Sequence, residues 1–380
     1  MSVLSLFGVV NTPEMEAAVL EVLRSGRIAS GPHVAAFESG LAALLDQAHV
    51  VTTVDMSNAM QLALYLAGVR AGDDVLTTAF ACMSTNSAIA VSAARPVWVD
   101  VAPGTACMDV ADFERAITPA TRAVILYHAA GYPAPAREIA AICRQRGIAL
   151  IEDCDNALLA QVDGGQVGTF GDFAVFSFYP NRQINATEGG ALACRDPRDA
   201  AAARKLRRFG IDASSFRDGR GEINPQSDIP VVGWSMAMNN LCAALGAAQL
   251  SGVTERLRQT RVHAQHIRQA LAGLPGVTLL EGAAGAEPSY WAVLIAVEQR
   301  DTVLAGLKAR GVAASILHQR NDIYTGFQAC VRELPHTDVL QRSVIALPCG
   351  WWLSTQDIGR LIGAVESALH EAAAIALQTS

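Results

Sequence analysis

Short apolar runs alternate with stretches that carry apolar residues at helical spacing through the first two thirds of the chain. Such runs are typical of strands that helices bury on both faces of a sheet. They occupy residues 75–79, 96–100, 123–128, 149–153, 173–178 and 191–194. Between them, 60–68 and 136–145 have the i, i+3, i+4 and i+7 apolar positions of helices. The alternation predicts an α/β fold with a mostly parallel sheet covered by helices.

A loop rich in Gly, Ser, Asp and Pro spans about 214–230 and introduces a second region. There the pattern predicts helices over 236–250, 262–271, 302–310 and 355–373, and strands over 291–297, 312–317 and 344–347. Two or three strands with flanking helices indicate a smaller C-terminal α+β domain. We place the large domain, with its N-terminal segment, at 1–245 and the small domain at 246–380. Two units suit 380 residues at about 150 residues per domain.

Composition narrows the function classes. Hydrophobic residues make up 51% and charged residues 17%, which is enough apolar material for a folded core. No run of about 18 apolar residues and no signal peptide is evident, so we expect a cytoplasmic protein without a membrane partner. The net charge of −7 and the absence of a basic stripe argue against nucleic acid. None of the eight cysteines forms a C-x-x-C pair, and we expect no metal site.

Polar residues follow three of the predicted strands. Asp153 ends the run 149–153, where open α/β sheets place ligand-binding groups, although an acid here can equally cap the next segment. Ser57 and Asn58 precede a predicted helix, whose first amides attract phosphate, although capping alone explains them too. Ser177 and Arg182 stand before two glycines and suggest an anion site, but they are also ordinary loop residues. Together the three strand ends suit a phosphorylated ligand.

The order of motifs resembles the DegT/DnrJ/EryC1/StrS family, the sugar aminotransferases of the fold type I pyridoxal phosphate (PLP) superfamily. The resemblance covers nearly the whole chain. It is carried by the residues at 25–34, 37–38, 79–82, 128–133, 151–153, 171–172, 177–180, 188–190 and 347–348.

The resemblance implies roles for five of these polar residues. Asp153 would pair with the pyridine nitrogen of the cofactor and keep it protonated, so that the ring accepts electrons. Asn156 stands where the family usually has a glutamine beside that ring. Ser57, Asn58 and Ser177 would hold the cofactor's phosphate.

One departure from the family pattern decides the chemistry. The family's Schiff-base lysine lies five residues after the serine, and here that position is Arg182. A guanidinium stays protonated, so it forms no Schiff base and is a poor general base. Lys205 and Lys308 are the only lysines, and both read as solvated surface residues of helices. We therefore expect any PLP, or its amine form pyridoxamine phosphate (PMP), to be held noncovalently.

Two further positions depart from the pattern. Cys82 stands where the family often stacks an aromatic residue on the cofactor ring, which reduces stacking. Ser235 lies in the stretch 233–237 that corresponds to a partner-subunit segment reaching the phosphate. The resemblance therefore implies a homodimer, with 233–240 of one chain near the phosphate pocket of the other.

The leading hypothesis is a sugar aminotransferase-like enzyme that acts on a keto- or amino-sugar, nucleotide-linked, with noncovalent PLP or PMP. Relatives with histidine in place of the lysine bind PMP in this way. His128, Asp155 and Glu188 are candidates for moving protons beside Arg182, although His128 can equally be structural.

Two alternatives stay open on the sequence. In the first, the chain is a noncatalytic partner or binding subunit. In the second, it is a cofactor-independent enzyme that uses Arg182 and the former phosphate pocket to bind an anionic substrate. Substrate contacts are expected in the loops 211–230 and 318–327. The stretch 318–321 suits a nucleotide diphosphate or an exposed polar turn.

Overall fold

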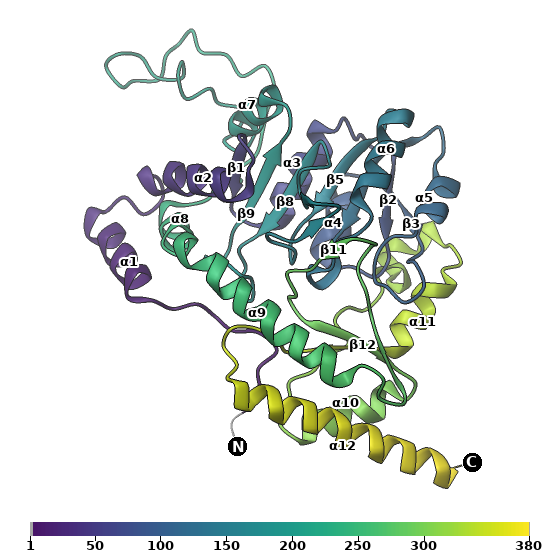
Figure 1. The fold of residues 1–380 in the computed structure, drawn as a ribbon. Helices are drawn as coiled ribbons and strands as arrows, with labels where there is room; N and C mark the ends of the chain where they lie inside the picture. The colour runs from purple at the N-terminus through teal and green to yellow at the C-terminus, as the bar shows by residue number, and fades with distance from the viewer. Residues whose placement is uncertain (1–2, 380) are drawn as a thin grey trace.

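A computed structural model describes residues 3–379 (Figure 1), including all side chains except those at 328, 329 and 379. The centre is a seven-stranded sheet in the order β1-β9-β8-β5-β4-β2-β3. The pairs β5–β8, β4–β5, β2–β4 and β2–β3 are parallel, whereas β9 runs antiparallel to both of its neighbours. The strands are β1 (Val50–Thr53), β2 (Asp74–Thr78), β3 (Arg95–Val99), β4 (Thr121–Tyr127), β5 (Ala149–Asp153), β8 (Phe173–Ser177) and β9 (Gly190–Cys194).

Helices cover both faces of this sheet because alternate strand residues are apolar on each side. One core contains residues of α2 (Pro32–Leu45), α5 (Val110–Ala116), α6 (Ala136–Arg146) and α8 (Asn240–Ala247). The other contains residues of α3 (Met56–Leu66), α4 (Met83–Val91) and α7 (Pro197–Leu206). The helix α1 (Pro13–Ser25) packs beside α8.

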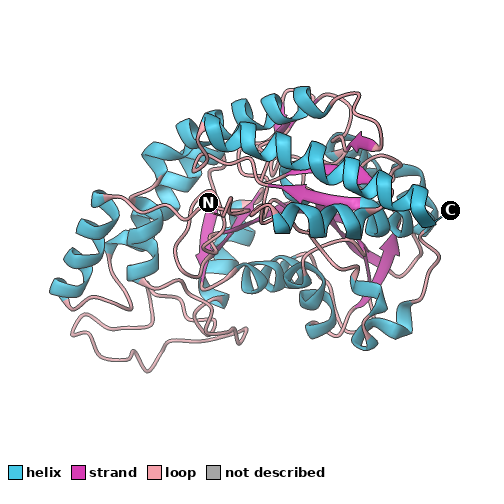
Figure 2. Ribbon diagram, turned by 90° about the horizontal axis from the view of Figure 1, so that it is seen from below, coloured by secondary structure: helices cyan, strands magenta, loops and turns pink. Residues whose placement is uncertain are grey.

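The smaller sheet has the order β10-β12-β13 and its own apolar core. Its strands are β10 (Val277–Leu279), β12 (Val293–Val297) and β13 (Val344–Leu347). It packs with α9 (Leu250–Leu271), α10 (Arg300–Ala309) and the long α12 (Thr355–Thr379). Figure 2 shows the strands of the molecule flanked by helices. The remaining elements are η1 (Ala129–Gly131), β6 (Gln161–Val162), β7 (Gly165–Gln166), β11 (Ala286–Glu287), η2 (Asn321–Ile323), η3 (Thr325–Cys330) and α11 (Pro335–Ser343).

The structure confirms the fold class, and the six predicted strands of the large sheet all form. Three details of the prediction were wrong. The stretch 312–317 makes only isolated bridges, from Val312 to Leu4 and from Ser315 to Ala346. The helix predicted over 236–250 begins at Asn240 and ends at Ala247. The last helix continues beyond residue 373 to Thr379.

The domain boundary at 245/246 stays a prediction, and residues before it contact residues after it. Leu4, near the start of the chain, packs in the core of the small sheet. β11, from the later part, pairs with β6 of the earlier part. No helix within residues 3–379 is long and apolar enough to cross a membrane.

Buried polar contacts fix the segment 318–343 against the large sheet. The Asp100 carboxylate, at the end of β3, accepts hydrogen bonds from the backbone N–H groups of His336 (2.9 Å) and Thr337 (2.7 Å) and from the Thr337 hydroxyl (2.7 Å). Arg332 forms a two-point ion pair with Asp112 of α5, at 2.5 and 2.6 Å. These contacts hold the start of α11 and the loop before it beside the ends of the parallel strands.

Replacing Asp100 tests this attachment. Asp100→Ala leaves the buried Thr337 donors unsatisfied, so we expect the free energy of unfolding to fall by about 3 kcal/mol in denaturant titrations. Asp301→Ala is the control, because Asp301 is 87% exposed and pairs only with its neighbour Arg300. Equal stability of the two variants would contradict the role of Asp100.

Candidate active site

Asp153 ends β5 at the carboxyl edge of the parallel strands, and its side chain is fully buried. One carboxylate oxygen accepts a hydrogen bond from the Thr85 hydroxyl at 2.6 Å. The other accepts one from the backbone N–H of Asp155 at 3.1 Å. Burial, with a contribution from the negative charge of Asp155, raises the pKa of Asp153 to about 7. The ionised Asp153 carboxylate therefore lacks enough nearby positive charge to offset its burial and the charge of Asp155.

Arg182 lies in the loop between β8 and β9 and is held by Asp155. Its Nε is 2.5 Å from Asp155 Oδ1, and its Nη2 is 2.7 Å from Oδ2, so the ion pair is bidentate. The Asp155 side chain is fully buried and that of Arg182 is 11% exposed. Burial lowers the pKa of Arg182, but the charge and hydrogen bonds of Asp155 outweigh it and leave the pKa raised. Arg182 is thus a fixed cation.

A chain of hydrogen bonds lies beside this pair. Asn156 Nδ2 donates to the Tyr127 hydroxyl at 2.8 Å, and that hydroxyl lies 2.9 Å from His318 Nε2. Burial lowers the pKa of His318 to about 4, so the imidazole is neutral and its Nε2 shares a hydrogen bond with the Tyr127 hydroxyl. Burial, with the charges of Asp155 and Asp153, raises the pKa of Tyr127 well above its usual range. Neither ring therefore adds charge to the site at neutral pH.

The buried site contains the carboxylates of Asp153 and Asp155 and one cation, Arg182, which is already paired with Asp155. Arg182 lowers the pKa of Asp153, but it contributes less than the burial and the Asp155 charge that raise it. Asn156 Oδ1 is also buried and has no hydrogen-bond partner within the described part of the chain. A buried acceptor without a donor is costly, and so is an uncompensated carboxylate. The site is therefore suited to a ligand that carries a positive charge and a hydrogen-bond donor.

The start of α3 differs in detail from the prediction. Asp55, rather than Ser57 or Asn58, is the N-cap: its carboxylate accepts from the Asn58 backbone N–H at 2.8 Å and from Asn58 Nδ2 at 2.6 Å. Helix geometry still leaves the amides of residues 56 and 57 free for a ligand. Burial and the negative charge of Asp55 raise the pKa of Glu188, so these two acids lie near one another.

The other predicted phosphate contacts lie on neighbouring elements. Ser177 ends β8, is 9% exposed, and accepts from the Tyr179 backbone N–H at 3.3 Å. Ser235 is exposed and makes a backbone bridge to Arg208. The next residue, Met236, accepts at its carbonyl from the Val54 N–H at 2.8 Å, which brings this stretch alongside the approach to α3.

Cys82 is the N-cap residue of α4, where its sulfur accepts from the Ser84 hydroxyl at 3.1 Å. It contributes to the raised pKa values of both Tyr127 and Arg182, so it lies beside the cluster as predicted from its position. It offers a small polarisable surface rather than an aromatic ring.

The structure contradicts a catalytic role for His128. Its Nδ1 accepts from the Ala134 backbone N–H at 3.0 Å, and its Nε2 lies 3.2 Å from Glu152 Oε2, so both ring nitrogens are used. Glu152 and Asp153 are adjacent in β5, and successive strand residues point to opposite faces. His128 is therefore a buried structural residue on the Glu152 side of the strand, which is the alternative that the sequence left open.

The stretch 318–321 is not a free cationic loop. Arg320 forms ion pairs with Asp322 and Asp338. Asn321 is buried and accepts from Asn86 Nδ2 at 2.8 Å. The Arg320 guanidinium and the Asn321 amide are already used within the protein, which favours the alternative of a structural polar turn over a nucleotide diphosphate site.

Sequence reasoning missed Thr85 and Tyr127, and it named His318 only as part of a substrate loop and not as a partner of Tyr127. Thr85 lies in the first turn of α4, Tyr127 is an apolar strand end, and His318 comes from the small-domain part of the chain. The Tyr127 and Asp153 positions pair directly in the β4–β5 register, which a confident strand alignment would have revealed. The approach of His318 depends on tertiary packing and left no local signal.

Comparison with known proteins assigns the family. The model of the DegT/DnrJ/EryC1/StrS aminotransferase family matches residues 10–366. The chain belongs to this family. A relative from Saccharopolyspora spinosa, "dTDP-4-dehydro-2,3,6-trideoxy-D-glucose 4-aminotransferase", is 36% identical over 315 residues, covering 81% of each chain.

Solved structures of family members superpose closely. AtS13 from Actinomadura melliaura is 34% identical, with a TM-score of 0.91 over 97% of this chain and 99% of that one. The sugar aminotransferase CalS13 from Micromonospora echinospora is 30% identical, with a TM-score of 0.90 over 96% and 99% of the two chains. The DegT/DnrJ/EryC1/StrS family is PLP- or PMP-dependent.

The residues present fit PLP or PMP. Asp153 lacks a cation, which a protonated pyridine nitrogen supplies, and Asn156 Oδ1 lacks a donor. The first amides of α3 and Ser177 would hold the phosphate, with Asp55 as an unfavourable neighbour. Arg182, tied to Asp155, cannot supply the covalent attachment.

Arg182 and Asp155 together determine whether a covalent bond can form. Arg182→Lys places an amine beside the Asp155 carboxylate, which raises the amine pKa and keeps it protonated. We expect little borohydride-reducible PLP adduct at pH 7.5 and more as the pH rises above 9. Arg182→Lys combined with Asp155→Ala should give the adduct at pH 7.5, measured as added mass on the peptide carrying residue 182.

Wild type is the control and should show no adduct on that peptide. Equal adduct in the single and double variants at pH 7.5 would remove Asp155 from the explanation. A wild-type adduct at Lys205 or Lys308 that supports turnover would disprove noncovalent binding.

Proposed function

We propose that this protein is an enzyme of the sugar aminotransferase type that acts on a nucleotide-linked keto- or amino-sugar and holds PLP or PMP noncovalently. The sugar substrate is supported by family membership and by the activity named for the S. spinosa relative. The noncovalent cofactor is supported by Arg182, which stands where the family has its lysine and is fixed by Asp155.

The observation that carries the proposal is the charge of the buried site. Asp153 has a raised pKa because it is buried beside Asp155, whose partner Arg182 is already committed. A bound ring with a protonated nitrogen would form the missing ion pair, and an acid without this partner would have little reason to be retained. When bound, the cofactor supplies an electron sink for chemistry at the carbon that carries nitrogen.

Each side chain of the site would then have a separate role. Asp153 keeps a proton on the ring nitrogen, and Thr85 orients the Asp153 carboxylate. Asn156, oriented by Tyr127, presents its free oxygen to a donor on the ligand. Arg182 contributes fixed positive charge without exchanging a proton. Glu188 is exposed at the loop end, its pKa is raised by partial burial and by the charge of Asp55, and it is the acid that we propose as the proton carrier.

A second candidate is a noncatalytic binding subunit with the same fold. The closed Asp155–Arg182 pair and the complete burial of Asp153 favour it, because a ligand reaches Asp153 only if side chains around it move. The two candidates predict different cofactor content.

Cofactor binding tests the proposal. We expect the purified protein to carry PMP or PLP, identified by absorbance and by the mass of the released molecule, and to rebind PMP after dialysis. Asp153→Ala removes the ion pair to the ring nitrogen, so PMP affinity should fall about 100-fold, consistent with a buried charge-assisted contact of about 3 kcal/mol.

Glu287→Ala, at an exposed strand position, is the control and should bind PMP like wild type. Absence of PMP and PLP binding to wild type would favour the noncatalytic candidate. Unchanged affinity of Asp153→Ala would remove Asp153 from cofactor recognition.

We also propose a homodimer. The segment that follows α7 projects from the body of the molecule (Figure 1) and exposes a series of apolar side chains, which is typical of a covered interface. These are Ile223, Ile229, Val231, Val232 and Trp234. Ser235 of the same segment is the residue that the family resemblance places near the partner's phosphate pocket.

Charge substitution in this segment tests the dimer. Wild type should sediment as a dimer at micromolar concentration, and Val232→Asp combined with Trp234→Asp should sediment as a monomer, because a buried unpaired carboxylate is strongly disfavoured. Val339→Asp, an exposed valine of α11, is the control and should stay dimeric. A monomeric wild type would contradict the proposal.

A further inference from the structure

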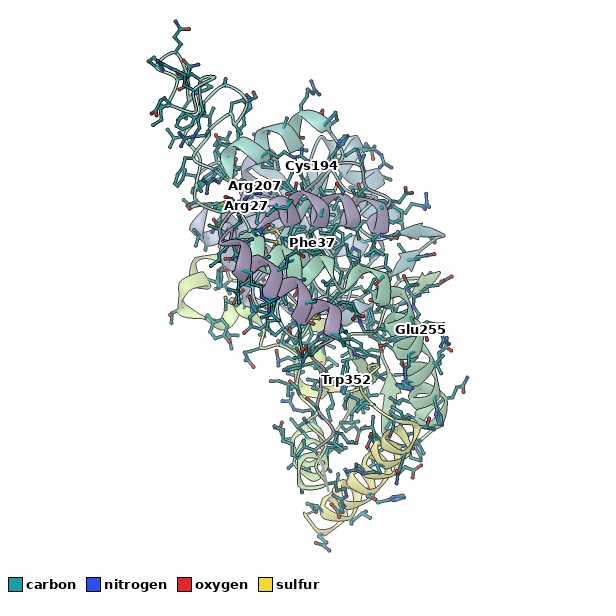
Figure 3. The ribbon with its side chains drawn as sticks, turned by 90° about the vertical axis from the view of Figure 1, so that its left-hand side faces the viewer. Arg27, Phe37, Cys194, Arg207, Glu255 and Trp352 are labelled. Carbon is teal, nitrogen blue, oxygen red and sulfur yellow. The ribbon has the colours of Figure 1, made fainter. Side chains whose placement is uncertain are left out.

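An open cavity of about 590 Å³ lies at the base of the projecting segment, apart from Asp153. It is formed by the start of α2, the end of α7 and residues of the segments 211–217 and 237–238. Four of its thirteen lining residues are arginines, namely Arg204, Arg207, Arg208 and Arg217. No aspartate or glutamate lines it within the described part of the chain. Arg207 lies near the base of the projecting loop in Figure 3.

Three of the four guanidinium groups have no carboxylate partner among the described residues. Arg207 is paired with Glu38 at 2.5 Å. Arg204 and Arg217 each donate to a backbone carbonyl, at 3.1 and 2.7 Å, and Arg208 lies over the ring of its neighbour Phe209. None of Arg204, Arg208 and Arg217 forms an ion pair with any residue from 3 to 379. Because the whole chain has a net charge of −7, this positive cluster does not reflect a generally basic surface.

The shape and chemistry of the cavity suit a phosphate ester. Guanidinium groups bind phosphate oxygens in a two-point geometry, and several of them together favour a ligand with more than one negative charge. The N-cap of the 14-residue helix α2 is Gly31, which lines the cavity, and Asn240 Oδ1 accepts from the His33 N–H in the first turn at 3.0 Å; the positive end of the helix dipole adds to the same field. Phe216 lines the cavity and offers an aromatic surface for a planar base.

The position of the cavity connects it to the candidate active site. Ala237 lines the cavity and makes a backbone bridge to Thr53, two residues before the Asp55 cap of α3. The cavity thus lies beside the segment 233–238 that we place at the dimer boundary. A substrate extending from an active site at that boundary would meet these arginines.

We propose that this cavity binds the diphosphate of the nucleotide-linked substrate, with Arg208 and Arg217 as its principal contacts. The inference rests on the proposed function for the class of substrate. It adds the subsite that recognises the nucleotide portion, at a place distinct from the residues that hold the cofactor.

Calorimetric titration with uridine diphosphate and thymidine diphosphate tests the subsite. At low ionic strength wild type should bind at least one of the two nucleotides. Arg208→Glu and Arg217→Glu should each weaken binding at least tenfold, corresponding to about 1.4 kcal/mol, because each removes a phosphate contact and adds repulsion. Binding should also weaken as salt is raised from 50 to 500 mM.

Arg146→Glu is the matched control, since it reverses an exposed arginine at the end of α6 and changes the net charge equally. It should bind nucleotide like wild type. A fourth variant, Arg204→Gln, should weaken binding without reversing charge. All four substituted arginines are exposed, so we expect each variant to fold like wild type, which thermal unfolding checks.

The outcomes separate this inference from the proposed function. Nucleotide binding that is unchanged in Arg208→Glu and Arg217→Glu overturns the subsite but leaves the substrate class intact. Wild type that binds neither nucleotide also overturns the subsite, whatever its PMP content. Pyrophosphate binding as tight as that of the nucleotides overturns recognition of the base by Phe216. Loss of nucleotide affinity with unchanged PMP affinity is the expected result.

Discussion

The buried ion pair between Asp155 and Arg182 governs the chemistry of this protein. It places a permanent cation in the loop after β8 and a carboxylate close to Asp153. Burial and the negative charge of Asp155 raise the pKa of Asp153, and Arg182, which is paired with Asp155, offsets them only in part. Removing either partner of the pair leaves a buried charge, so the two residues are best understood as one unit.

The pair lies in loops that the scaffold positions but whose residues the scaffold does not dictate. The large sheet, with apolar cores on both faces, positions the ends of β4, β5 and β8 independently of the residues that follow them. Tyr127, Asp155 and Arg182 lie at or just beyond these ends, where substitution changes the site without disturbing strand packing. His318 reaches Tyr127 because Asp100 and Asp112 hold the segment that follows His318 against the large sheet.

Positive charge is distributed in two separate places. At the candidate active site it is balanced within the protein by Asp155, which suits a fixed element of the site. In the four-arginine cavity three guanidinium groups have no carboxylate partner, which suits binding of an anion that comes and goes. The proposed substrate would use both regions if its sugar lay near Asp153 and its nucleotide in the cavity of the proposed dimer.

The sequence by itself determined the architecture and much of the site. Strand and helix periodicity gave the large sheet because burial on both faces requires continuous apolar runs, and motif order placed Asp153, Ser177 and Arg182 at strand ends. Tertiary structure alone decided which of these side chains meet. It paired Arg182 with Asp155, turned His128 toward Glu152, made Asp55 the cap of α3 and brought His318 to Tyr127 from 191 residues away. Local patterns fix which element a residue occupies, whereas the partner and protonation of a buried polar group depend on atoms that only the folded chain brings within a few ångströms.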